Sequence, residues 1–102
     1  MQAGVDVISM SVKIYLYYGP YEAAGTVEYR QFRLQGLKTI LTEAGHIVEL
    51  RPFRDWNVVE LWVNGVKIFS CDIRNLDFGG DGKLDPLCQE ACDAVKRNMQ
   101  IL

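Results

Sequence analysis

The sequence predicts one two-layer α/β domain with a mixed β-sheet. Three observations predict it: a strand-like alternation that begins at Val12, two stretches with helical spacing of apolar residues, and an Asn64-Gly65 pair between two β-branched runs. A chain of 102 residues, 49% of them hydrophobic, has enough apolar side chains for one core and too few residues for two domains. We therefore expect residues 12–102 to form a single domain, preceded by a flexible or folded-back leader over residues 1–11.

The predicted domain begins with a strand and a helix. Over residues 12–17 apolar side chains alternate with lysine and tyrosine, which is the two-residue period of a strand, and Gly19-Pro20 ends it and starts a loop. Within residues 27–44 apolar side chains recur at spacings of three and four, at Leu34, Leu37, Ile40, Leu41 and Ala44. This spacing predicts a helix with Thr26 as its N-cap and Gly45 as its stop.

A second strand and a hairpin follow. The β-branched run at residues 46–53 comes directly after the helix, so we expect it to pair in parallel with the first strand. Residues 58–63 and 66–71 flank Asn64-Gly65, which readily adopts the positive φ angles of a two-residue type I′ turn. This pattern predicts an antiparallel hairpin.

A glycine-rich loop and a second helix complete the chain. Residues 72–83 contain Gly79, Gly80 and Gly82 and are predicted to form an extended loop. Asp85-Pro86 then supplies an N-cap followed by proline at the first helical position. The helix is expected to run to about Met99, with one apolar face made of Leu84, Cys88, Ala91, Val95 and Met99.

The resulting order β-α-β-β-β-α is the minimal thioredoxin-like arrangement. We expect the strands, numbered along the chain, to lie in the order 2-1-3-4, with the third strand antiparallel to the centre of the sheet. Both helices are expected on one face of the sheet.

Composition limits the classes of partner. The formal net charge is −2 and the pI is about 5.3, which lacks the basic excess of a nucleic-acid binder. No apolar run is long enough to cross a bilayer, and the first ten residues lack the basic start of a signal peptide. We expect a cytoplasmic protein that contacts neither nucleic acid nor membrane.

The cysteines are better explained by packing than by chemistry. Cys88 and Cys92 lie four residues apart on one predicted helix, a poor arrangement for a disulfide and only half of a zinc site, and His46, the sole histidine, lies elsewhere. Free cysteine is among the most buried residue types. The EF-hand spacing is absent from the acidic loop residues Asp77, Asp81 and Asp85. No metal or cofactor is therefore expected.

Four runs of the sequence carry a family resemblance: Tyr18-Gly19-Pro20-Tyr21, Phe32-Arg33-Leu34-Gln35-Gly36-Leu37, Asp55-Trp56-Asn57-Val58-Val59-Glu60-Leu61, and Phe78-Gly79-Gly80-Asp81-Gly82-Lys83-Leu84-Asp85-Pro86-Leu87-Cys88. In this order they resemble an uncharacterised small eukaryotic protein family, catalogued as number zero-seven-two-eight. The likeness covers roughly residues 12–95 and implies no known activity.

A more distant resemblance concerns the thioredoxin fold. The run Glu60-Leu61-Trp62-Val63-Asn64-Gly65 followed by Gly80-Asp81-Gly82 is similar to the selenoprotein-W-like branch of that fold. Those proteins need Cys-x-x-Cys, or selenocysteine in the second place, after the first strand. Residues 16–21 contain no cysteine, so the resemblance implies a redox-inactive relative.

The predicted sheet has one face that no helix covers. The strand period places under the helices Val12, Ile14, Leu16, Val48, Leu50, Val59, Leu61, Val63, Val66 and Ile68. The open face then carries Lys13, Tyr15, Tyr17, Val58, Glu60, Trp62, Lys67, Phe69 and Cys71. Four aromatic rings on one open face are typical of an interaction surface. Alternatively, the leader covers these rings, or aromatic pairs only stabilise the sheet.

These patterns predict a non-enzymatic interaction or structural module that docks a protein partner, or a second copy of itself, through the open face. The expected contact residues are Tyr15, Tyr17, Val58, Trp62 and Phe69, extended at one end by Tyr18, Tyr21 and Trp56. For this eukaryotic family we expect a ciliary or axonemal assembly. The alternative is a thiol-dependent redox protein or adaptor that uses Cys71, Cys88 or Cys92, with His46 as the base.

Overall fold

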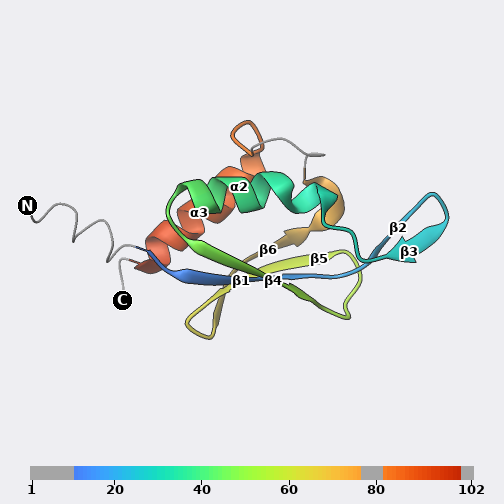
Figure 1. Cartoon of the computed structure of the whole chain (residues 1–102), viewed down its shortest axis with the longest axis horizontal. Coiled ribbons are helices and arrows are strands. Elements are labelled where there is room, and N and C mark those ends of the chain that lie inside the picture. The colour runs from blue at the N-terminus through green and yellow to red at the C-terminus, as the bar shows by residue number, and fades with distance from the viewer. Residues whose placement is uncertain (1–10, 77–81, 100–102) are drawn as a thin grey trace, which may run out of the picture.

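The computed structural model describes residues 11–76 and 82–99, which form a mixed α/β fold as the sequence predicts (Figure 1). This part of the chain contains a four-stranded sheet, a two-stranded sheet and two α-helices. In chain order the elements are β1 (Lys13–Tyr18), β2 (Tyr21–Ala23), β3 (Thr26–Glu28), the 3-10 helix η1 (Phe32–Leu34), α2 (Gln35–Glu43), β4 (Ile47–Pro52), β5 (Val58–Val63), β6 (Val66–Asp72), the 3-10 helix η2 (Ile73–Asn75) and α3 (Pro86–Met99).

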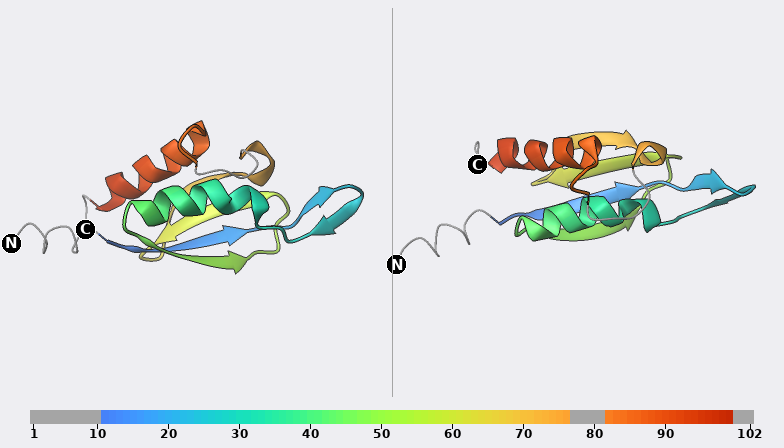
Figure 2. Two further views of the ribbon diagram at one scale, coloured as in Figure 1. Left: turned by 45° about the horizontal axis from the view of Figure 1, so that its top comes forward. Right: turned by 90° about the horizontal axis from the view of Figure 1, so that it is seen from above.

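The main sheet has the strand order β4-β1-β5-β6. β1 pairs in parallel with β4, so α2 is the crossover of a βαβ unit, and β5 and β6 add antiparallel strands on the other side. Both helices lie on the same side of this sheet (Figures 1 and 2). None of the described helices has the length and apolar character needed to span a membrane.

The core lies between the sheet and the helices. Its fully buried side chains come from both layers: Ile14, Leu16, Val59 and Leu61 from the strands, Leu34, Leu37 and Leu41 from η1 and α2, and Ala91 and Val95 from α3. These residues follow the two-residue and 3.6-residue periods of the sequence, which is why the layers could be predicted.

The first helix is shorter than predicted. α2 begins at Gln35 and not near residue 27, and Thr26 is the first residue of β3 and not an N-cap. Residues 21–28 instead form a hairpin whose two turn residues, Ala24 and Gly25, have φ angles of 54° and 79°. This hairpin, β2–β3, extends away from the two layers (Figures 1 and 2).

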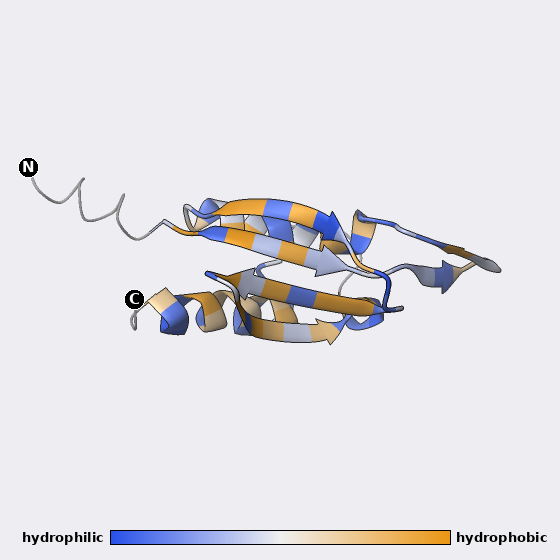
Figure 3. Ribbon diagram, turned by 90° about the horizontal axis from the view of Figure 1, so that it is seen from below, coloured by the Kyte–Doolittle hydropathy of each residue, from blue (hydrophilic) through white to orange (hydrophobic). Residues whose placement is uncertain are grey.

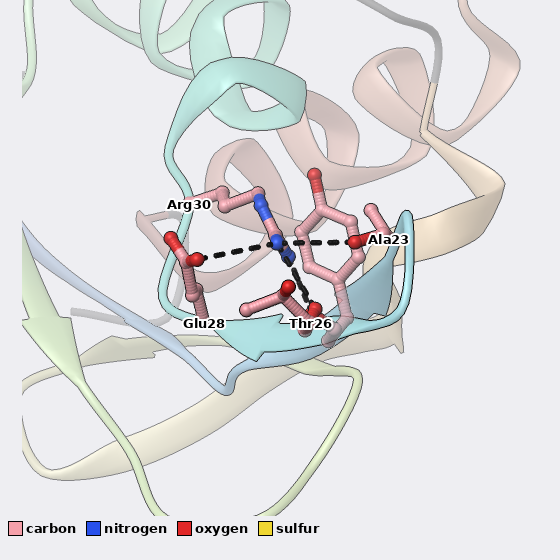
Figure 4. Close-up of polar contacts among 5 residues, drawn as sticks. Ala23, Thr26, Glu28 and Arg30 are labelled. Atoms are coloured by element: carbon pink, nitrogen blue, oxygen red, sulfur yellow. Dashed lines mark hydrogen bonds and ion pairs between the residues drawn. The ribbon is translucent and has the colours of Figure 1, made fainter.

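Arg30 holds the β2–β3 hairpin together (Figure 4). Its guanidinium donates to the carbonyl oxygens of Tyr21 at 2.6 Å and Thr26 at 3.0 Å, and it lies 5.2 Å from the centroid of the Tyr21 ring. The planar fork of arginine can serve several carbonyls at once. These contacts reach back four and nine residues along the chain and stabilise a hairpin where the first turns of the helix were predicted.

The predicted stop of the first helix and the predicted cap of the second helix are confirmed. Gly45 has a φ of 97°, and the His46 N–H donates to the Leu41 carbonyl at 3.2 Å, as in a Schellman motif. The Asp85 carboxylate caps α3 by accepting from the Leu87 N–H at 2.9 Å. Leu84 was expected on the apolar face of this helix, but it precedes the cap and is 93% exposed.

The β5–β6 hairpin has the predicted turn and an unpredicted bulge. Asn64 and Gly65 have φ angles of 52° and 78°, as a type I′ turn requires. Between Leu61 and Trp62 the pairing shifts by one residue, which leaves Ile68 as the extra residue of β6. Val66, predicted to lie under the helices, is 56% exposed beside the turn.

Two glycines allow backbone segments that are distant in sequence to touch. A Cβ atom on Gly19 would lie 1.6 Å from the Asp55 carbonyl oxygen, and one on Gly82 would lie 2.4 Å from the Gly36 carbonyl oxygen. Of the four runs that carried the family resemblance, the first therefore touches the third, and the second touches the fourth. Residues 1–10 of the predicted leader and the loop glycines Gly79 and Gly80 lie outside the described residues.

Candidate functional site

The face of the main sheet opposite the helices carries the candidate site (Figure 3). In this view the strands lie in front of the helices, and hydrophobic and hydrophilic residues alternate along them. The register places Tyr15 opposite Trp62 and Tyr17 opposite Glu60, so rings from β1 and β5 share this open face.

A pocket of about 200 Å³ lies on this face. Its lining consists of Tyr17, Phe53, Glu60 and Trp62. The Tyr17 ring centroid lies 5.7 Å from that of Phe53 and 6.2 Å from that of Trp62, with interplanar angles of 65° and 75°. The rings are thus steeply inclined to one another and are not stacked in parallel.

One carboxylate lies among these rings. The Glu60 side chain is only 13% exposed, and its Oε1 accepts a hydrogen bond from the Trp62 Nε1–H at 2.9 Å. Its Oε2 lies 3.5 Å from the Nζ of Lys67, a side chain that is 48% exposed. The carboxylate therefore fixes the orientation of the Trp62 ring and gives the pocket a negative group.

Beside the pocket, Tyr15 lies among charged side chains. The Nζ of Lys13 and the guanidinium carbon of Arg51 are each 5.1 Å from the Tyr15 ring centroid, within the range of cation–π contacts. Both cations also pair with Glu49, and these hydrogen bonds hold the pKa of its carboxyl below the usual range. Cations are thus already bound against an aromatic ring on this face.

The structure brings together some of the predicted contact residues. Tyr15, Tyr17 and Trp62 lie on the open face, and Val58 joins them at the end of β5, opposite Asp72. Trp56 lies in the turn before β5 and is 60% exposed.

Phe69 and Cys71 were predicted on the open face, and this prediction is wrong. The bulge places Phe69 opposite Leu61 and Cys71 opposite Val59, and both pack against the core. A one-residue shift moves every later side chain of a strand to the other face.

Tyr18 and Tyr21 also lie in the core, where they are 6% and 4% exposed. Tyr18 continues the inward alternation of β1 and accepts a hydrogen bond from the Gln31 side chain at 2.9 Å. Tyr21 lies under Arg30. Neither residue extends the open surface as predicted.

Sequence reasoning missed Phe53 as a site residue and did not single out Glu60. Phe53 follows the end of β4, and its N–H donates to the Tyr18 carbonyl at 2.9 Å, so the pairing of the two strands continues one step further. It lies two residues after Arg51, which is opposite Tyr17. The same two-residue period could have placed it on the open face.

The thiols have surroundings that suit packing. Cys88 and Cys92 are 1% and 8% exposed, and no disulfide joins any of the three cysteines, all of which lie in the described part of the chain. Burial raises the pKa of the Cys71 thiol to about 12, which disfavours the reactive thiolate. Within residues 11–76 and 82–99, no cluster of three histidine, cysteine or acidic side chains could hold a metal ion.

His46 has a structural contact. Its Nδ1 accepts a hydrogen bond from the Val12 N–H at 3.3 Å, at the start of β1. The side chain is 7% exposed, and this desolvation lowers its pKa.

The fold and this pocket define a small mixed α/β protein with an open, aromatic sheet face. The chain belongs to the uncharacterised protein family UPF0728, whose model matches residues 8–95, and the family resemblance of the sequence is thereby confirmed.

The relatives match this chain over most of their own length. The chain is 59% identical over 86 residues to a UPF0728 protein of Branchiostoma floridae, covering 84% of this chain and 94% of that one. It is 59% identical over 83 residues to the human UPF0728 protein C10orf53, covering 80% and 89%. A UPF0728 protein of Nematostella vectensis is 44% identical over 85 residues, covering 83% and 93%. No solved structure matches the chain.

Proposed function

We propose that this protein is a non-enzymatic binding module that docks a protein partner through the open face of its main sheet. The observation that carries the proposal is the pocket formed by Tyr17, Phe53, Glu60 and Trp62 on a face that neither helix covers. An uncovered antiparallel face is ordinarily polar. Aromatic side chains beside a partly desolvated carboxylate are the kind of anchors that dominate binding energy at protein interfaces.

We further propose that the fold is a minimal, redox-inactive thioredoxin-like arrangement. The parallel β1–β4 pair with its helical crossover, followed by the β5–β6 hairpin and α3, supports it. The run Glu60-Leu61-Trp62-Val63-Asn64-Gly65 followed by Gly80-Asp81-Gly82 supports an ancestry near the selenoprotein-W-like branch, and the lack of a cysteine in residues 16–21 supports the loss of its chemistry. For the location we propose the cytoplasm, within a ciliary or axonemal assembly, which imaging of the tagged full chain in ciliated cells tests.

The docking proposal is tested with the full chain and matched variants. Partners that co-purify with the tagged protein are identified, prepared pure and titrated against it to give a Kd. We expect Tyr17→Ser and Trp62→Ser to weaken binding at least about tenfold, while the melting temperature changes little. Leu84→Ser, which removes an exposed apolar side chain that does not line the pocket, is the control and should bind normally.

Two outcomes would overturn docking through this face, and a third would change its occupant. An unchanged Kd in both ring variants would place the interface elsewhere. We expect only Phe69→Ser, which removes a core-facing ring, to unfold the domain. If Tyr17→Ser and Trp62→Ser also unfold it, these rings belong to the interior or lie under the protein's own leader. A concentration-dependent dimer in sedimentation equilibrium that Trp62→Ser abolishes would show that the occupant of this face is a second copy of the chain and not another protein.

The thiol-dependent alternative gains no support from the geometry. The Cys71 thiol has a raised pKa, and Cys88 and Cys92 are buried in α3. His46 uses its Nδ1 for the Val12 N–H.

A further inference from the structure

The chemistry of the pocket indicates which group of the partner it receives. Ring faces carry negative potential and attract cations, and the attraction is strongest when water is excluded. Three rings and one carboxylate make up the lining, so the pocket is matched to a positively charged group. The neighbouring Tyr15, with Lys13 and Arg51 each 5.1 Å from its centroid, shows the same kind of contact within the protein.

The hydrogen-bonding capacity of the pocket narrows the choice of cation. Both oxygens of Glu60 already have partners: Oε1 accepts from the Trp62 indole, and Oε2 lies 3.5 Å from the Lys67 ammonium. A primary ammonium has three N–H donors and arginine has five, and ring faces provide no strong acceptor for them. Burying such donors without partners is costly. A trimethylammonium group has a positive charge and no donor, so it loses no hydrogen bond on entry.

The shape of the lining agrees with a rounded cation. The Tyr17 ring is inclined by 65° to the Phe53 ring and by 75° to the Trp62 ring. One rounded group can therefore contact several rings at once. A flat guanidinium would be better matched by a single parallel ring. The volume of about 200 Å³ is sufficient for an alkylammonium head but not for a folded peptide segment.

We propose that the pocket of Tyr17, Phe53, Glu60 and Trp62 binds the side chain of an Nε-trimethyllysine on the protein partner. This inference rests on the proposed docking function and names the group that anchors it. Glu60 supplies the negative charge and holds the Trp62 ring in place, and the three rings surround the methyl groups. Lys67 stays paired with the Glu60 carboxylate, and its positive charge offsets part of the attraction that Glu60 exerts on a bound cation.

The test uses the 15N-labelled full chain and the probe Nα-acetyl-Nε-trimethyllysine methylamide. The indole N–H signals of Trp62 and Trp56 are distinguished with Trp56→Phe. We expect a saturable shift of the Trp62 signal and none of the Trp56 signal. The neutral isostere, in which carbon replaces the charged nitrogen, should bind about 5- to 30-fold more weakly. Unmethylated lysine should bind at least about tenfold more weakly.

Charge variants separate the proposed role from a structural one. Glu60→Gln keeps an acceptor for the Trp62 indole and removes the charge, and it should weaken probe binding at least about fivefold. Glu49→Gln, on the same face outside the pocket, should leave it unchanged. Lys67→Gln removes a positive charge beside the pocket and keeps a donor for Glu60, and it should strengthen binding about 1.5- to 5-fold, an effect that a merely structural pocket would not produce.

The possible failures are distinguishable. No saturable shift at Trp62, or equal binding of the neutral isostere, would overturn the cation pocket. If the partner's Kd still rises on Trp62→Ser in that case, docking through the face stands. If choline binds more tightly than the lysine probe, the proposal that the bound cation belongs to a protein is overturned. The partner titrations then test the docking function separately.

Discussion

Replacing Gly19 with alanine tests the contact between the end of β1 and the turn before β5. The added Cβ would lie 1.6 Å from the Asp55 carbonyl oxygen, whereas ordinary contacts begin at 3.4 Å, so the two segments must separate by about 1.8 Å. That movement strains the hydrogen bonds from the Gly19 N–H to Val58 and from the Asn57 N–H to Pro20, both 2.9 Å long. Overpacking of this kind costs about 1–3 kcal/mol, and each weakened hydrogen bond adds about 1 kcal/mol. We expect Gly19→Ala to lower the free energy of unfolding by about 3–5 kcal/mol.

The matched control is Gly25→Ala. Gly25 has a φ of 79° and no atom within 4 Å of the added Cβ, so only backbone strain of about 1–2 kcal/mol is expected. Urea denaturation followed by circular dichroism measures both variants. For a chain of this size, a loss of 3 kcal/mol corresponds to a fall in melting temperature of roughly 12–24 °C. Equal losses in the two variants, within about 0.5 kcal/mol, would refute the reasoning, because the close approach at Asp55 would then have no energetic consequence.

Three further predictions concern single side chains. The free energy of unfolding should fall as the pH drops from about 6.5 to 5, because His46 has a lowered pKa in the folded state and the unfolded chain takes up the proton first. Urea titrations across this pH range should show a flatter dependence for His46→Gln, and an unchanged slope would contradict the assignment. Asp85→Ala should cost about 1 kcal/mol by removing the cap on the Leu87 N–H, and Asp85→Asn, which keeps a capping oxygen, should cost less in the same denaturation assay. The three native thiols should react with a disulfide reagent far more slowly than in urea, given the raised pKa of Cys71 and the burial of Cys88 and Cys92, whereas one fast thiol would favour the redox alternative.

Local sequence signals were sufficient wherever a few neighbouring residues decide the conformation. The Asn64-Gly65 turn, the stop at Gly45 and the cap at Asp85 depend on backbone angles and hydrogen bonds within a few positions, and all three occur as predicted. The alternation in β1 likewise placed Ile14 and Leu16 in the core and Tyr15 and Tyr17 on the open face. These signals predicted the α/β class and most of the sheet.

Interactions that lie outside the pattern of any single strand or helix decided the rest. The predicted helix included residues 27–33, but the guanidinium of Arg30 binds carbonyls of a hairpin that the apolar spacing did not indicate. The bulge beside Trp62 turned Phe69 and Cys71 into the core, because the two-residue period of a strand reverses its faces with a single inserted residue. The sequence of one strand does not show where an extra residue will fall when that strand pairs with its neighbour.

The candidate site shows the same division. The sequence by itself determined that rings on β1 and β5 face away from the helices, because alternation along a strand is a property of the chain. Only the tertiary structure decided that Phe53, one residue past the end of β4, joins Tyr17 and Trp62 around the Glu60 carboxylate. The pocket exists because three separate strands lie side by side in one register, and a register is fixed by the packing of the whole sheet and not by any one strand.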